Sequence, residues 1–138
     1  MEFESFVYGC IVDTRRKDPV RRQTNRAAMQ SLPTSDDWQF LAREMFSLPE
    51  IKQLDEGPIN NEVVHFGASY RGIEYEWQSW IAQFEQLLGK MYWVSAKVHL
   101  ETVMSGTHTF TWETSGDYHE PGSGDMQVQC EWSREDVF

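Results

Sequence analysis

Residues 73–90 read IEYEWQSWIAQFEQLLGK, and this stretch decides the fold class. Side chains spaced three or four positions apart share one side of an α-helix. The bulky apolar residues with this spacing are Trp77, Trp80, Ile81, Phe84, Leu87 and Leu88. The pattern predicts a long helix whose stripe, anchored by Trp80, Phe84 and Leu87, packs on a sheet.

Strand patterns lie on both sides of this helix. Before it, residues 3–13 (FESFVYGCIVD) and 62–70 (EVVHFGASY) are rich in the aromatic and β-branched residues that favour strands. After it, we expect three more strands, in residues 93–103 (WVSAKVHLETV), 108–114 (HTFTWET) and 125–132 (DMQVQCEW). The sequence therefore predicts about five strands in a largely antiparallel sheet.

Two further helices are expected between the first two strands. The first begins at Pro19, a residue suited to the first helical position, and ends before Pro33. The second lies between Asp36 and Pro49, because Asp36 and Gln39 have capping-box spacing. Its apolar stripe would be Trp38, Leu41 and Met45. With about three helices on one face of the sheet, residues 1–138 are predicted to form a single two-layer α+β domain.

The turn after residue 103 determines which side chains share a sheet face. A three-residue loop at 105–107 pairs Leu100 with Trp112 and gathers the apolar side chains toward the helices, whereas a two-residue loop mixes charged and aromatic groups on one face. His99 and His108 then lie on opposite faces and cannot share a metal. The last strand is expected to point Met126, Val128, Cys130 and Trp132 inward. The solvent-facing set is predicted to be Lys97, His99, Glu101, Thr109, Thr111, Glu113, Gln127, Gln129 and Glu131.

This polar sheet face has two interpretations. It is either an ordinary solvated face or a flat acidic platform that binds a protein. On the second interpretation, the partner-binding residues on the sheet are His99, Glu101, Glu113 and Glu131. Further candidates are Glu74, Glu76 and Glu85 on the long helix and Tyr118 in the loop at 115–125.

The charge of the chain restricts its partners. The net charge is −10, and residues 35–138 alone carry −12, because residues 1–34 hold six basic and four acidic side chains. This balance disfavours nucleic acid and anionic membrane as partners and favours a basic protein. The basic side chains Arg15, Arg16, Lys17, Arg21, Arg22 and Arg26 are interpreted as a solvated helix or as an internal counter-charge for the acidic body.

Localisation and redox state follow from the same composition. No stretch approaches the roughly 20 apolar residues that span a bilayer, and the start MEFESFVYGC lacks the basic region of a signal peptide. We therefore expect a cytoplasmic protein. Its two cysteines, Cys10 and Cys130, are far apart in expected strands and are interpreted as reduced packing residues.

The sequence contains no recognisable catalytic, cofactor or metal motif. It lacks a Walker loop, a dinucleotide-binding glycine pattern, a serine elbow and zinc-type spacing of Cys and His. The loop at 115–125 gathers Asp117, Glu120 and Asp125 on glycine-rich backbone, but its spacing matches no calcium loop, so we interpret it as a hairpin connection. Asp36 and Asp37 are interpreted as helix caps. We therefore predict no catalytic residue, no cofactor, no metal and no enzymatic activity.

In character the chain resembles the immunity proteins of bacterial polymorphic toxins and secretion-system effectors. The stretches that carry the resemblance are VVHFGASYRGIEYEWQSWIAQFEQLLGK (63–90) and KVHLETVMSGTHTFTWE (97–113). This class comprises many folds without a shared signature, so it assigns no residue by motif. It implies a tight one-to-one complex in which the protein blocks a cognate toxin, often by presenting acidic side chains to a basic cleft.

Two other functions remain open at this point. One is an enzyme or small-ligand-binding domain with a pocket between sheet and helices, lined by Trp and Tyr and holding a polar residue such as His65. The other is an adaptor or chaperone for a secreted protein.

Overall fold

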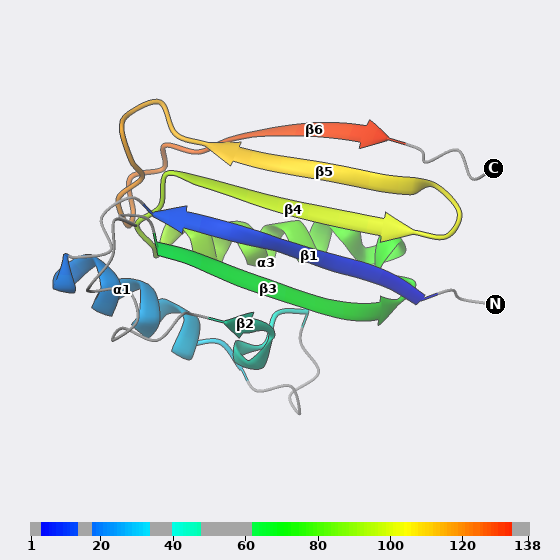
Figure 1. Cartoon of the computed structure of the whole chain (residues 1–138), viewed down its shortest axis with the longest axis horizontal. Helices are drawn as coiled ribbons and strands as arrows, with labels where there is room; N and C mark the ends of the chain where they lie inside the picture. The colour runs from blue at the N-terminus through cyan, green and yellow to red at the C-terminus, as the bar shows by residue number, and fades with distance from the viewer. Residues whose placement is uncertain (1–3, 14–17, 34–39, 48–61, 134–138) are drawn as a thin grey trace.

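The structure of the chain is a computed structural model that describes residues 4–13, 18–33, 40–47 and 62–133 (Figure 1). These residues form one six-stranded sheet, all of whose pairs are antiparallel, in the order β2-β3-β1-β4-β5-β6. The strands are β1 (Glu4–Asp13), β2 (Phe46–Ser47), β3 (Glu62–Arg71), β4 (Ser95–Thr102), β5 (Gly106–Glu113) and β6 (Gln127–Ser133). The two α-helices of the described residues are α1 (Pro19–Gln30) and α3 (Trp77–Gly89).

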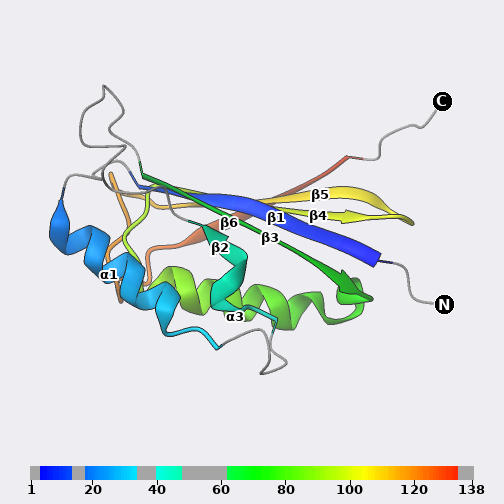
Figure 2. The same cartoon turned by 60° about the horizontal axis from the view of Figure 1, so that its bottom comes forward.

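Both helices lie on the same face of the sheet, and no helix of the described residues lies on the other face (Figure 2). The predicted α+β class with helices on one face is confirmed. The described part of the chain has six strands where about five were expected, and two α-helices where about three were expected. Short 3₁₀ turns, η2 (Arg43–Met45) and η3 (Ile73–Glu76), supplement the helices.

The helix expected between Asp36 and Pro49 is wrong where the structure describes it. Residues 43–45 form only a 3₁₀ turn, and Phe46 and Ser47 then pair with β3. Pairing with the edge of β3 gives hydrogen-bond partners to backbone N–H and C=O groups, many of which would remain unpaired at the ends of a short helix. Tertiary contacts therefore override the local helical pattern. Leu41 is nevertheless buried. Asp36, Asp37, Trp38 and Gln39 lie outside the described residues.

The predicted apolar stripe of α3 is confirmed as the centre of the core. Trp80, Phe84, Leu87 and Leu88 are all buried. Phe84 contacts rings from both layers, with centroid distances of 5.2 Å to Trp80, 5.3 Å to Phe66 on β3 and 5.0 Å to Trp112 on β5. These ring contacts join α3 to two strands of the sheet, β3 and β5.

The β4–β5 hairpin has the predicted faces but a different register. Leu100 pairs with His108 rather than Trp112, and the turn is at 103–105 rather than 105–107. Gly106 has a φ of 81°, a left-handed conformation that suits the residue closing a three-residue hairpin loop. The backbone N–H of Ser105 donates to the Thr102 hydroxyl at 2.9 Å and fixes the turn. The register differs by an even number of residues, so every side chain keeps its face.

The last strand points its side chains as expected but does not bury them. Val128, Cys130 and Trp132 lie on the helix side of β6, since they pair with Trp112, Phe110 and His108. All three are exposed, because the helices cover the middle of the sheet and β6 is its edge. The interpretation of Cys130 as a packing residue is therefore wrong, whereas Cys10 is half-buried.

Candidate functional site

The uncovered face of the sheet is the candidate site. Alternation along the strands places on it the complete polar set that the sequence predicted for β4, β5 and β6. Strands β1 and β3 continue the surface on the other side of β4. We call the whole surface the open face; its additional members are Glu4, Phe6, Tyr8, Cys10, Val12, Val63, His65, Gly67, Ser69 and Arg71.

Aromatic side chains stand at the middle of the open face. Phe6 and Tyr8 are adjacent outward positions of β1, and they are 46% and 41% exposed. The Tyr8 ring packs on His99 of β4, with 5.0 Å between centroids. Nδ1 of His99 lies 2.9 Å from Oγ1 of Thr109 on β5. Contacts across three strands therefore hold Tyr8 and His99 in fixed positions.

The electrostatics of the open face combine acidic side chains with a neutral centre. Desolvation, reinforced by Lys97 and opposed by Glu101, lowers the pKa of His99 below its usual value and so favours the uncharged imidazole. The other ionic groups of the face are four carboxylates and two cations. They are Glu4, Glu101, Glu113, Glu131, Arg71 and Lys97.

The structure separates the predicted partner-binding residues into two sets. His99, Glu101, Glu113 and Glu131 share the open face. The three glutamates of the helix layer lie on the other side of the sheet, and two of them are already hydrogen-bonded: Glu74 accepts from Ser5 at 2.6 Å and Glu85 accepts from the indole of Trp112 at 3.2 Å. The third, Glu76, is exposed. One flat partner surface cannot contact both sets.

Sequence reasoning did not single out Phe6 and Tyr8 as part of this face. Apolar residues occupy both alternating sets of β1, because Val7 and Ile11 point to the core while Phe6 and Tyr8 point outward. Such a pattern is also typical of a strand covered on both faces. Only the one-sided placement of the helices distinguishes the two cases.

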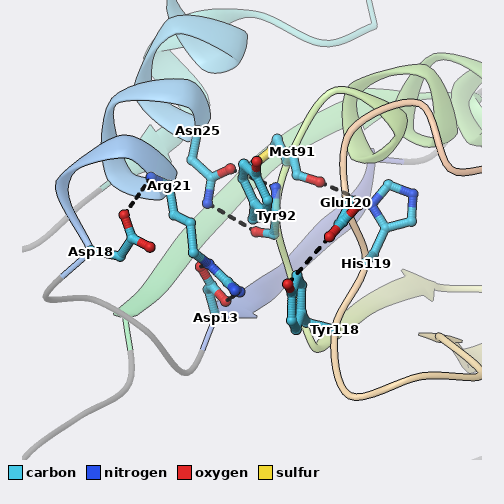
Figure 3. Close-up of polar contacts among 9 residues, drawn as sticks. All are labelled: Asp13, Asp18, Arg21, Asn25, Met91, Tyr92, Tyr118, His119 and Glu120. Carbon is cyan, nitrogen blue, oxygen red and sulfur yellow. Dashed lines mark hydrogen bonds and ion pairs between the residues drawn. The ribbon is translucent and has the colours of Figure 1, made fainter.

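A second polar cluster joins α1 to β1 and to the loops that precede β4 and β6 (Figure 3). Arg21 is buried and forms a bidentate ion pair with Asp13, in which Nε donates to Oδ2 at 3.1 Å and Nη2 donates to Oδ1. Its guanidinium also lies over the rings of Tyr92 and Tyr118, with Cζ 4.9 Å and 4.2 Å from their centroids. Asn25 exchanges two hydrogen bonds with the backbone of Tyr92. This cluster fastens α1 in place.

The same end of α1 carries a second ion pair, which is partly buried. Arg22 donates through Nε to Glu62 at 3.2 Å, and desolvation raises the pKa of Glu62 despite this partner. The counter-charge interpretation of the basic segment is therefore supported at Arg21 and Arg22, whereas residues 15–17 lie outside the described residues. Tyr118, a predicted partner-binding residue, packs on Arg21 and is only partly exposed.

Arg21→Lys is expected to lower the free energy of unfolding by about 1–3 kcal/mol, because an ammonium can neither donate a bidentate pair to Asp13 nor pack on the two tyrosine rings as a planar guanidinium does. Urea denaturation measures the loss. Arg71→Lys, at an exposed position of β3, is the matched control and should change stability by no more than about 0.5 kcal/mol. Equal stabilities of the two variants would show that the contacts of Arg21 with the two rings and the carboxylate add nothing to the free energy of unfolding.

The loop at 115–125 is fixed to the core at its centre. His119 is fully buried, stacks on Trp93 at 4.8 Å and places Nδ1 2.9 Å from the backbone oxygen of Met91. His119 is therefore part of the core and not of the surface. Asp125 accepts hydrogen bonds from Thr114 and Ser115, which lower its pKa to about 2. Within the described ranges, no three His, Cys, Asp or Glu side chains are grouped as metal ligands.

The pocket suggested around His65 is not formed. His65 is exposed on the open face, on the opposite side of the sheet from the helices. Rings such as Trp80, Phe84 and Trp112 fill the space between the layers. Two surface cavities of about 210 and 260 Å³ border α1, and neither has a Trp, Tyr or His side chain in its lining.

Neither α1 nor α3, the α-helices of the described residues, is long and apolar enough to cross a bilayer. Comparison of the chain with protein-family models, with curated proteins and with solved structures finds no significant match.

Proposed function

We propose that the protein neutralises a bacterial toxin by direct binding, with the open face as its contact surface. One observation carries this proposal: a broad sheet face that no helix of the described residues covers presents two half-exposed aromatic rings, Phe6 and Tyr8, on a central strand. Exposed aromatic side chains on rigid backbone supply the buried centre of many protein interfaces at small entropic cost. The open face therefore suits a preformed protein-binding surface.

Charge gives the partner a chemical character. Glu101, Glu113 and Glu131 flank the aromatic centre on β4, β5 and β6. In a chain with a net charge of −10, they favour a partner whose binding region is basic. Such complementarity raises the association rate above the unsteered range of roughly 10⁵–10⁶ per molar per second more surely than it raises affinity. We call Phe6 and Tyr8 the aromatic centre and the three glutamates the acidic rim. The acidic rim is expected to act on the association rate and the aromatic centre on the dissociation rate.

The first test concerns the acidic rim. A partner is captured from the native host, identified, and tested for toxicity on expression with and without this protein. Reversing Glu101, Glu113 and Glu131 together to Lys should slow association with that partner at least about tenfold at low salt and weaken its salt dependence. Glu76→Lys, an exposed reversal in the helix layer, is the control and should leave the association rate within about twofold.

The second test concerns the aromatic centre. Tyr8→Ala should accelerate dissociation of the same partner about tenfold or more while changing association little, because a buried anchor acts mainly on the lifetime of the complex. Unchanged kinetics in both the triple variant and the Tyr8 variant would place the interface elsewhere. A captured partner that is not toxic would favour the adaptor or chaperone function instead, and failure to capture any protein would overturn the inhibitor proposal.

A further inference from the structure

The outer edge of β6 is an unpaired sheet edge. Its inner edge pairs with β5 over seven residues, and no strand of the described part of the chain pairs with the other side. Edge strands are usually protected by proline, lysine, bulges or a covering element. Between Gln127 and Ser133 there is no Pro, Lys or Arg. The strand therefore offers a free row of backbone donors and acceptors.

Apolar side chains accompany this free edge. On the helix side of β6, Val128 is 48% exposed and Trp132 is 54% exposed, and Cys130 between them is also exposed. The indole N–H of Trp132 donates to the backbone oxygen of Ser105, so the ring is held in place. In Figure 1, β6 forms one border of the sheet, and α3 lies behind the middle strands. An apolar surface is thus fixed beside an unpaired backbone.

We propose that β6 pairs antiparallel with β6 of a second copy of this chain, about a two-fold axis at Cys130. In this register Val128 of each copy lies opposite Trp132 of the other, and Cys130 lies opposite Cys130. On the other side of the ladder, Glu131 lies opposite Gln129, so no two carboxylates face each other directly. All seven residues of each strand are paired. The strand is therefore complementary to itself, as an isologous interface requires.

Neighbouring registers are less favourable. A one-residue shift of the pairing turns the apolar side chains of one copy to the polar side of the other. An axis at Glu131 places two carboxylates directly opposite each other. An axis at Gln129 leaves Trp132 opposite Met126, which precedes the strand, and so shortens the ladder. The axis at Cys130 alone combines full pairing with matched side chains.

The size and charge of this contact determine how the dimer behaves. A seven-residue edge with two aromatic side chains is smaller than a standard stable interface, so we expect a dissociation constant on the order of 10 µM. Each copy carries −10, so added salt should strengthen the dimer by screening repulsion. Binding of a basic partner to the open face should respond to salt in the opposite direction. The two interactions are therefore distinguishable, and the dimer leaves both open faces free on the same side of the joined sheet.

Analytical ultracentrifugation of the whole chain under reducing conditions, over a wide concentration range and at two salt concentrations, tests the dimer. Val128→Lys should shift the dissociation constant at least about tenfold toward monomer, because lysine protects sheet edges. Val103→Lys is the matched control: Val103 is 68% exposed at the tip of the β4–β5 hairpin, and its variant should dimerise like the unchanged protein. Circular dichroism verifies that both variants are folded.

Disulfide trapping tests the register. Gln129→Cys and Glu131→Cys are each made in a chain in which Cys10 and Cys130 are replaced by Ser. Under mild oxidation the mixture should cross-link at least about tenfold faster than either variant alone, because residue 129 of one copy lies opposite residue 131 of the other and neither residue lies opposite itself.

Several outcomes would overturn the proposal. A chain that remains monomeric at all concentrations would do so, and so would a dimer whose dissociation constant is unchanged by Val128→Lys. The proposed register would be wrong if either single-cysteine variant alone cross-linked as fast as the mixture. If the chain is monomeric and Val128→Lys instead abolishes binding of the captured partner, the edge of β6 belongs to that partner's interface.

Discussion

Replacing Gly9 by alanine is expected to lower the free energy of unfolding by about 3 kcal/mol or more. Gly9 lies in β1, between β3 and β4. A Cβ atom at this position would stand 1.9 Å from the backbone oxygen of Lys97 and 2.9 Å from Cζ of Phe66. A ring can rotate aside, but a carbonyl within a central ladder can move only if the two strands separate. The substitution therefore disrupts β1–β4 pairing at the centre of the sheet.

Gly67→Ala is the matched control for this prediction. Gly67 lies in β3, and its Cβ would meet Cβ of Tyr8 at 3.5 Å, an ordinary contact. We expect its free energy of unfolding to change by no more than about 1 kcal/mol. Urea denaturation, monitored by tryptophan fluorescence, compares the two variants. Equal midpoints would show that β1 and β4 do not approach each other as closely as the structure indicates.

The sequence predicted which elements form and which faces they bury, because both depend on short-range periodicity. Trp80 and Phe84 follow the helical period, and His99 and Glu101 follow the alternation of a strand. The acidic half of the open face could therefore be assigned residue by residue. The assignment survived a wrong hairpin register, since an even shift leaves each side chain on its face.

The hairpin register itself required information that the apolar pattern does not hold. Both registers collect the same apolar side chains on one face, and they differ only in where the chain reverses. The left-handed conformation of Gly106 and the hydrogen bond from Ser105 to Thr102 select the observed turn. Gly106 directly follows the observed three-residue loop, whereas the prediction placed it in the middle of its loop.

The aromatic half of the open face and the exposure of β6 could not be predicted from the sequence, and for the same reason. Periodicity gives the direction of a side chain relative to its strand but not the extent of the helices across the sheet. Phe6 and Val7 are adjacent apolar residues of β1, yet only Val7 points toward the helix layer and is buried. Trp132 points toward that layer but lies beyond it, at the edge of the sheet. Both candidate binding surfaces therefore arise where the two α-helices of the described residues do not cover the whole sheet.

Phe84→Ala is expected to lower the free energy of unfolding by about 3–5 kcal/mol, the usual cost of removing a buried ring and leaving a cavity. Phe84 has no solvent exposure, and its ring lies within 5.3 Å, centroid to centroid, of rings on α3, β3 and β5. Trp112 cannot relax into the space without losing its hydrogen bond to Glu85, so the cavity cannot collapse fully.

Gln86→Ala is the control for this prediction. Gln86 is exposed and lies two residues further along α3, so its replacement should change the free energy of unfolding by no more than about 0.5 kcal/mol. Urea denaturation should show a lower midpoint for the Phe84 variant at an unchanged m-value, since both proteins expose nearly the same surface on unfolding. A midpoint equal to that of the Gln86 variant would mean that this ring does not lie between the layers, and the packing of α3 on the sheet would then be wrong.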